Sequence, residues 1–127
     1  MAMAFRTRKL IMPAQLNCAG TLFGGQALAW IDEESAIYAA CQLGGRTNIV
    51  TKAMSAIDFK SPARLNEMIE IGTDLVQLGR TSITVSCVIR NKTTHEEIVR
   101  VDRIVFVLVD EHGTPIPHGV SQPVEEP

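Results

Sequence analysis

The sequence predicts an α+β domain in which one long helix packs against an antiparallel sheet of about five strands. One stretch, residues 26–43, has a helical composition, and the chain after residue 48 turns to strand patterns joined by tight turns. The length of 127 residues is typical of one domain rather than two. The apolar share of 46% and the charged share of 20% exclude disorder by composition.

The first third of the chain is predicted to contain a short strand, a loop and the helix. Residues 5–12 alternate loosely and stop at Pro13, which favours a strand. Residues 15–25 hold too many glycines and small residues for regular structure. The helix over 26–43 lacks proline and ends at a Gly-Gly pair, as helix C-termini commonly do. Because few of its positions are polar, we expect it to be buried on most of its circumference.

Four strands are expected after the helix, over residues 49–59, 67–78, 81–90 and 96–109. The third alternates most clearly, with Ile83, Val85, Cys87 and Ile89 on one face. The last ends in a run, 104–109, that is apolar on both faces. Since one helix cannot cover five strands, the free sheet edge and this second apolar face predict that another copy completes the core as a dimer.

The domain is expected to span residues 1–117, followed by a flexible tail over 118–127. The chain after Pro115 holds three of the six prolines and two glutamates, which is typical of a fraying end. The beginning of the chain lacks the apolar core of a signal peptide, and the three scattered cysteines are typical of reduced thiols. We therefore expect a cytoplasmic protein.

Charge and hydropathy exclude several classes of function. Twelve Lys and Arg against 14 Asp and Glu give a net charge of −2 without any long run of like charge, so nucleic-acid binding is not expected. No stretch of about 18 apolar residues occurs, so no membrane span is predicted. The histidines, His95, His112 and His118, fall in turns or the tail, where we expect them to be exposed, and lack metal-ligand spacing. We expect neither a metal nor a resident cofactor.

Asp32 is the first candidate catalytic residue because of its neighbours on the helix. At about 100° per residue, it lies in an arc of small and apolar side chains. Glu33 and Glu34 fall about 100° and 200° further round, so the three acids cannot share one narrow face. A carboxylate among apolar groups is poorly solvated, as in a catalytic base or nucleophile. The alternative is that all three acids belong to the solvated surface of the helix.

The glycines that open the helix form a second candidate site. The backbone N–H groups of Gly24, Gly25 and Gln26 are expected to lack partners at the helix start. Without side chains at the two glycines, a ligand carbonyl or anion can approach the backbone closely. The alternative is a tight turn that needs glycine for its dihedral angles. The spacing matches neither a Walker A loop nor the GxGxxG dinucleotide fingerprint.

Other nucleophiles lack the partners that their chemistry needs. Ser55 and Ser61 have no nearby histidine and no GxSxG motif, so a serine hydrolase is unsupported.

Three basic residues are candidates for phosphate binding. Lys60, Arg64 and Arg80 lie near strand ends, where they are ordinarily solvated. If they converge, they can bind phosphate groups.

The chain resembles a known enzyme family over roughly residues 8–117. The segment 17–25, Asn-Cys-Ala-Gly-Thr-Leu-Phe-Gly-Gly, is followed by Trp-Ile-Asp-Glu at 30–33. This combination is similar to the NxxGxxFGG…D pattern of hotdog-fold acyl-CoA thioesterases, above all the bacterial YciA type and the cytosolic acyl-CoA hydrolases of animals. The likeness continues through residues 50–51, 58–63 and 79–82. It implies the hotdog fold, a long helix wrapped by an antiparallel sheet, with active sites at a dimer interface.

The resemblance also implies roles for particular residues. Asp32 matches the catalytic carboxylate, which either activates a water molecule or attacks the thioester carbonyl itself. Asn17 matches the motif asparagine, which would approach from the partner subunit and orient the water or the carbonyl. The N–H groups of Gly24 and Gly25 look like the donors that polarise the thioester oxygen. The residues similar to segments that contact the coenzyme A nucleotide are Lys60, Ser61, Gly79, Arg80, Thr81 and Ser82.

The resemblance thus implies an acyl-CoA thioester hydrolase that acts in lipid metabolism. Coenzyme A would be part of the substrate and product, and the protein would be a homo-oligomer of at least two chains; family members often form hexamers as trimers of dimers. One alternative is a non-catalytic acyl-CoA-binding or regulatory protein of the same fold. Another is a hydratase or dehydratase, which would need an active-site histidine; every histidine here lies beyond residue 94.

Overall fold

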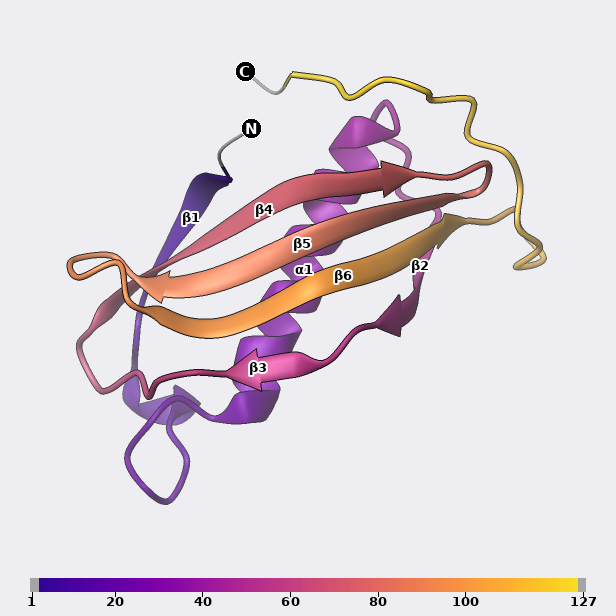
Figure 1. The fold of residues 1–127 in the computed structure, drawn as a ribbon. Helices are drawn as coiled ribbons and strands as arrows, with labels where there is room; N and C mark the ends of the chain where they lie inside the picture. The colour runs from indigo at the N-terminus through magenta and orange to yellow at the C-terminus, as the bar shows by residue number, and fades with distance from the viewer. Residues whose placement is uncertain (1–2, 126–127) are drawn as a thin grey trace.

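A computed structural model describes residues 3–125 and shows one helix lying against one antiparallel sheet (Figure 1). The strands are β1 (Ala4–Leu10), β2 (Ile49–Met54), β3 (Ile57–Phe59), β4 (Met68–Leu78), β5 (Ser82–Asn91) and β6 (Glu97–Leu108). The helix α1 (Gly24–Gln42) follows a single 3-10 turn at Pro13–Gln15. This arrangement confirms the α+β class and the single long helix.

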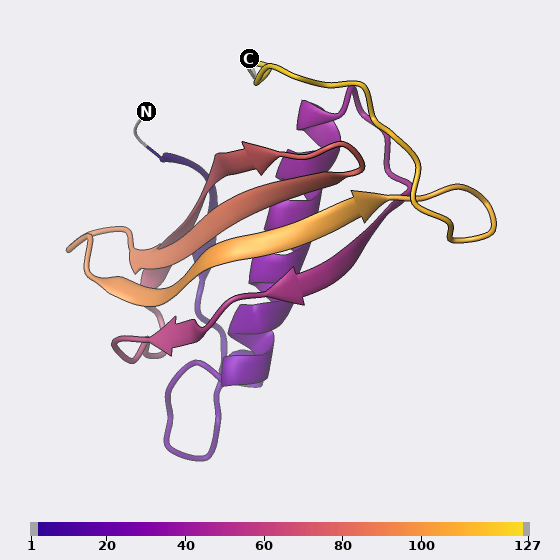
Figure 2. The ribbon, with the colours of Figure 1, turned by 45° about the vertical axis from the view of Figure 1, so that its right-hand side comes forward.

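The strand order across the sheet is β1-β4-β5-β6-β2, and β3 also pairs with β6. All pairings are antiparallel. Strands β1 and β2 therefore form opposite edges, and the curved sheet wraps the helix between them (Figures 1 and 2). Because α1 crosses the concave face of the sheet, one side of the helix faces β1 and the opposite side faces β2.

The expected strand over residues 49–59 is wrong in one respect, since the structure divides it into β2 and β3. At the break, the Ser55 N–H donates to the Arg103 carbonyl at 2.8 Å, and the Arg103 N–H donates to Ser55 Oγ at 3.1 Å. A side-chain hydroxyl thus replaces the backbone carbonyl as acceptor, which interrupts the ladder. Within residues 3–125 the sheet accordingly has six strands, close to the expected number of about five.

Helix α1 is buried on most of its circumference, as predicted. Its exposed residues, spaced four apart, form one stripe: Gly25, Ala29, Glu33, Ile37 and Cys41. The helix ends one residue before the expected position, where Gly44 and Gly45 adopt positive φ angles of 74° and 84°. Glycine favours this left-handed conformation because it has no Cβ, so the pair ends the helix.

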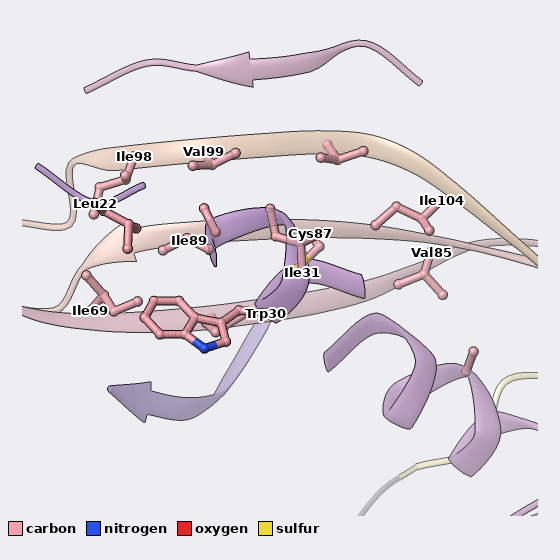
Figure 3. Close-up of a cluster of buried hydrophobic side chains, with 14 of the residues drawn as sticks. Leu22, Trp30, Ile31, Ile69, Val85, Cys87, Ile89, Ile98, Val99 and Ile104 are labelled. Carbon is pink, nitrogen blue, oxygen red and sulfur yellow. The ribbon is translucent and has the colours of Figure 1, made fainter. Parts of the chain in front are cut away.

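The core lies between α1 and the concave face of the sheet. Trp30 and Ile31 from the helix meet buried side chains of β4, β5 and β6 (Figure 3). The predicted inward face of β5, from Ile83 to Ile89, has no solvent exposure. Burial raises the pKa of the Cys87 thiol to about 12, so this cysteine is a neutral core residue rather than a nucleophile.

The sequence offers two arguments for a dimer, an apolar second face at residues 104–109 and a free sheet edge. The structure weakens the first and strengthens the second. The second apolar face of residues 104–109 is already covered within one chain, because Val107 and Val109 are buried. In contrast, β2 pairs with β6 alone among the described strands, so its outer edge is free. Exposed residues occupy positions 50–53 of this strand. A free edge of this kind is a template for pairing with another chain.

The chain after β6 folds back onto the domain. Val109 forms a bridge to Pro115, and the Ile116 N–H donates to the Leu108 carbonyl at 2.9 Å. The Gln42 amide exchanges two hydrogen bonds with the Val124 backbone, at 2.7 and 2.8 Å. The flexibility of residues 118–127 stays a prediction, but these contacts tie the tail to the domain as far as residue 124.

The expectation that every histidine is exposed is wrong for His118. His95 and His112 are exposed, whereas His118 is buried with 5% of its surface accessible. The ring is enclosed because the tail returns to the turn between β4 and β5, a contact that no local pattern reveals.

Candidate active site

Asp32 lies on the side of α1 that faces the edge strand β2. The Thr51 hydroxyl of β2 donates a hydrogen bond to Asp32 Oδ1 at 2.7 Å. Asp32 is half-buried, and its partner strand β2 is one of the two edge strands of the sheet. The Thr51 hydroxyl therefore binds one oxygen of the carboxylate, and the carboxylate lies beside the exposed strand β2.

The three acids of the helix point in different directions, as their spacing predicts. Glu33 is exposed in the outer stripe. Glu34 is half-buried and accepts a hydrogen bond from the Thr7 hydroxyl of β1 at 2.8 Å. Since β1 and β2 are opposite edges, Asp32 and Glu34 face opposite ends of the sheet order. Asp32 and Glu34 are thus each half-buried beside an edge strand, but only the strand beside Asp32, β2, has four successive exposed residues, at positions 50–53.

The start of α1 has no side-chain cap. Phe23 is the N-cap residue and supplies no side-chain hydrogen bond. Within the described part of the chain, the N–H groups of Gly24 and Gly25 donate to no acceptor. The Gln26 N–H differs from expectation, because it donates to the Phe23 carbonyl at 3.0 Å. Two backbone donors therefore remain open at the positive end of the helix.

Aromatic rings flank these two donors. A Cβ at Gly25 would lie 2.7 Å from the Phe23 ring, and one at Gly24 would lie 3.4 Å from the Phe59 ring. Both rings are more than half exposed. Glycine at position 25 lets the backbone approach Phe23 closely, and the open N–H groups lie beside exposed apolar surface.

The Asn17 side chain is engaged within its own loop. Its Oδ1 accepts hydrogen bonds from the N–H groups of Ala19 at 2.9 Å and Thr21 at 3.1 Å. Its Nδ2 donates to Thr21 Oγ1 at 3.0 Å. The loop projects beyond the start of α1, away from the sheet (Figures 1 and 2). Within one chain, this asparagine shapes a projecting loop and leaves one amide N–H uncommitted.

The residues expected to contact the nucleotide do not converge within one chain. Lys60 and Ser61 lie at one end of β6, where both backbone N–H groups donate to the Ile98 carbonyl. The turn 79–82 lies at the other end, where Ser82 pairs with Val107. At a rise of about 3.3 Å per residue, positions 98 and 107 are about 30 Å apart. One chain therefore presents two separate candidate sites.

Lys60 belongs to an ion-pair cluster that the sequence does not reveal. Its Nζ lies 3.1 Å from Glu97 Oε1, and Arg100 Nε donates to the same oxygen at 2.9 Å. The Arg100 hydrogen bonds, with a smaller contribution from Lys60, lower the pKa of Glu97 to about 2. Glu97 meets Lys60 because β3 pairs with β6, and only long-range strand pairing shows this.

Clusters of metal ligands and membrane-crossing helices are both absent from the part of the chain that the structure describes. Within residues 3–125, no three His, Cys, Asp or Glu side chains gather in a way that could hold a metal ion. No helix in the same range is both long and apolar enough to cross a membrane.

Comparison with known proteins agrees with this fold. The family described as "Thioesterase superfamily" matches residues 19–98. An uncharacterized acyl-CoA thioester hydrolase of Zymomonas mobilis is 30% identical over 111 residues, which cover 85% of this chain and 73% of that protein. The acyl-CoA thioester hydrolase YciA of Salmonella typhimurium is 28% identical over 120 residues, 90% of this chain and 89% of that protein.

Solved structures show the same architecture. A hexameric hotdog fold thioesterase of Campylobacter jejuni superimposes with a TM-score of 0.76 at 27% identity, covering 91% of this chain and 88% of that one. An acyl-CoA hydrolase of Staphylococcus aureus, solved with butyryl coenzyme A, coenzyme A and coenzyme A disulfide, gives 0.78 at 26% identity, covering 91% and 68%. With a single helix wrapped by an antiparallel sheet and a matching family over most of its length, this chain belongs to the thioesterase superfamily and has the hotdog fold.

Proposed function

We propose that the protein hydrolyses acyl-CoA thioesters to a free acid and coenzyme A. The observation that carries this proposal is the Asp32 carboxylate, held by Thr51 beside the free edge of β2. The names of its relatives and the butyryl coenzyme A bound to the S. aureus structure support the substrate class. In this proposal, coenzyme A is part of the substrate and product, and no resident cofactor takes part.

The hydrolysis of a thioester requires few catalytic groups. Its thiolate is a good leaving group, so one carboxylate, one positioned water and a donor to the carbonyl oxygen are sufficient. Asp32 supplies the carboxylate, as the base that activates water or as the nucleophile that attacks the carbonyl carbon. The Gly24 and Gly25 N–H groups supply the donors. The loss of one such donor typically costs about 2.7–4 kcal/mol of transition-state stabilisation.

These groups cannot act together within a single chain. Eight residues of helix separate Gly24 from Asp32, which is about 12 Å along the axis at 1.5 Å per residue. A carbonyl carbon and its oxygen must each lie roughly 3 Å from the groups that act on them. We therefore infer that Asp32 of one chain works with the helix start and the Asn17 loop of another. We therefore propose a homo-oligomer of at least two chains. The hexameric thioesterases among the similar solved structures support a larger assembly.

The first test measures thiol release from acyl-CoAs of short to long chain. Asp32→Asn removes the charge with little change in size, and we expect kcat to fall by about 10²- to 10⁴-fold, as for the loss of a catalytic base. Glu33→Gln is the matched control, because Glu33 neighbours Asp32 in sequence but is exposed. We expect it to retain wild-type turnover. The oligomeric mass of each variant is compared with that of the wild type.

The outcomes separate the competing functions. Turnover that survives in a folded Asp32→Asn variant would show that the assigned carboxylate is not catalytic. A wild-type protein that binds coenzyme A but hydrolyses no thioester would favour the non-catalytic binding protein. The same substrate panel identifies the acyl-chain length that the site accepts.

A further inference from the structure

The segment 116–120, called the tail segment below, crosses the turn between β4 and β5. This turn, residues 79–82, holds three carbonyl groups that accept hydrogen bonds from outside it. The His118 N–H donates to the Arg80 carbonyl at 3.1 Å, and the Leu108 N–H donates to that of Thr81 at 2.9 Å. The His118 ring nitrogen Nε2 lies 2.9 Å from the Ser82 carbonyl. One buried histidine therefore binds the turn at two of its three carbonyl groups.

The hydrogen bonds of His118 define its tautomer. The Ser82 carbonyl can only accept, so Nε2 carries the proton. Nδ1 accepts from the Val120 N–H at 3.0 Å and is therefore unprotonated. Both ring nitrogens are occupied, one by the turn and the other by the tail segment. The ring therefore links these two pieces of chain.

Arg46 ties the same histidine to the end of the helix. Its Nη2 donates to the His118 carbonyl at 2.7 Å, and its Nε donates to the Leu43 carbonyl, also at 2.7 Å. Separately, beyond the tail segment, the Gln42 side chain binds the chain at Val124. Figure 1 shows the yellow tail passing from the end of β6, across this end of the sheet, toward the end of α1. The turn is thus bound by the tail segment, which Arg46 links to Leu43, the residue that follows α1.

The contacts also give the turn a narrow, defined shape. The Gly79 N–H donates to the Ser82 carbonyl at 2.9 Å, and a Cβ at Gly79 would collide with Ser82 Oγ. The Arg80 side chain remains exposed at the tip. An exposed guanidinium on a backbone held in one conformation is a suitable partner for a phosphate group, because less flexibility is lost on binding.

We propose that His118 is a positioning residue for the nucleotide part of acyl-CoA. It holds the turn 79–82 in the conformation in which Arg80 meets a phosphate group of the nucleotide. This inference rests on the proposed function and extends it, because it makes the tail segment part of the substrate-binding end of the protein. It also assigns a different partner to each ring nitrogen, so the two can be tested separately.

Two substitutions separate the two ring nitrogens. His118→Gln places an amide N–H near the position of Nε2 and keeps the donor to Ser82. His118→Asn places polar atoms near the position of Nδ1 and keeps the acceptor for Val120, but it does not reach Ser82. We expect His118→Asn to raise KM for acyl-CoA about tenfold with kcat unchanged, the size of effect that one lost hydrogen bond has. His118→Gln should stay close to wild type.

A truncated substrate distinguishes nucleotide binding from a general loss of structure. The same acyl group on N-acetylcysteamine carries the thioester but no nucleotide, and we expect both His118 variants to hydrolyse it at the wild-type kcat/KM. Gln42→Met is the control for tail attachment, since Gln42 binds the tail at Val124 but does not touch the turn. It should leave KM for acyl-CoA unchanged. Arg80→Gln, at an exposed position, should raise KM as His118→Asn does.

Coenzyme A binding is measured by calorimetry on the same variants, so that the inference is tested whether or not the wild type turns over. A Kd about tenfold higher in His118→Asn and in Arg80→Gln supports it. Unchanged Kd and KM in Arg80→Gln would overturn it, as would equal losses on both substrates in His118→Asn or a matching rise in KM in Gln42→Met. A wild type that binds coenzyme A tightly but hydrolyses neither thioester would refute the proposed function alone.

Discussion

At the scale of single residues, the candidate site depends on hydroxyl and amide groups that orient other groups. Thr51 binds one oxygen of the Asp32 carboxylate, which leaves Oδ2 available for water or a thioester carbon. Asn17 binds its own loop through three neighbouring donors and acceptors. Both side chains therefore have a structural role in the chain, and a catalytic role has to be separated from it by matched substitutions.

Thr51 is expected to position Asp32, and its hydroxyl can be removed without changing the size of the side chain. Thr51→Val should lower kcat about 10- to 100-fold, because a hydrogen bond to a charged group contributes about 1.5–3 kcal/mol. Thr51→Ser keeps the hydroxyl and should restore most of the turnover. Steady-state kinetics on one acyl-CoA measures both. Equal kcat in Thr51→Val and wild type would show that the contact has no part in catalysis.

Asn17 offers a similar separation of loop structure from catalysis. Asn17→Asp keeps the oxygen that accepts from Ala19 and Thr21, so the loop should keep its shape, but the amide donor is lost. We expect its free energy of unfolding to stay close to that of the wild type while kcat falls at least tenfold. Asn17→Ala should lose turnover and also about 1 kcal/mol of stability. An active Asn17→Asp enzyme would assign this residue a purely structural role.

At the scale of elements, β3 is the piece of the sheet whose position depends most on side chains. It is only three residues long, and the ladder is broken before it at Ser55. Lys60 and Ser61, directly after it, both contact Glu97 of β6: Lys60 through its ammonium and Ser61 by donating to the Glu97 carbonyl at 2.7 Å. The Glu97 carboxylate thus joins a short strand to a long one.

This cluster predicts a stability that depends on acid pH. The pKa of folded Glu97 is about 2, below its ordinary value of 4.5. The stabilisation is therefore fully present above pH 4.5 and is lost as the pH falls toward 2. We expect the wild type to be more stable than Glu97→Gln at pH 7, with the difference shrinking between pH 4.5 and 3. Urea unfolding at each pH measures this.

Glu96→Gln is the matched control, because Glu96 is the sequence neighbour of Glu97 but its side chain is exposed. Its stability should follow that of the wild type at every pH. A difference between wild type and Glu97→Gln that persists unchanged at pH 3 would contradict the assigned role of the ion pairs.

At the scale of the whole molecule, one chain does not bring together all the groups of the proposed catalytic site. Asp32 lies beside the free edge of β2, the open N–H groups are about 12 Å away along the helix, and the Asn17 loop projects from the domain. Each feature is explained if two chains meet along the β2 edge and exchange these groups. The proposed oligomer is then a requirement of catalysis and not only of stability.

A charge on the free edge tests this arrangement. Val50 is an exposed apolar residue of β2, and Val50→Glu places a charge where a second chain is expected to pair. We expect the variant to have a lower oligomeric mass by light scattering and to lose turnover, although the Asp32–Thr51 contact lies within one chain. Val124→Glu changes a similarly exposed valine on the tail and should retain both properties. A single-chain Val50→Glu protein with wild-type kcat would show that one chain holds a complete site.

The sequence by itself determined the features that depend on local pattern. Alternation and turn residues predicted β4, β5 and β6 within two residues of their observed ends, and the Gly-Gly pair located the end of α1. The motif around residues 17–32 indicated the family, which the comparisons confirm, and Asp32 as the candidate base or nucleophile, a role that stays a prediction. The strands, the helix end and the family are predictable because apolar periodicity, glycine dihedral angles and a short motif are properties of neighbouring residues.

Only the tertiary structure decided the contacts between distant segments. It broke the strand 49–59 at Ser55, brought Thr51 to Asp32, joined Lys60 to Glu97, and enclosed His118 against the turn 79–82. It also showed that the residues expected to contact the nucleotide fall into two groups, 60–61 and 79–82, at opposite ends of β6. The physical reason is that strand pairing sets which side chains meet, and pairing is selected by the burial of the whole core rather than by any local pattern.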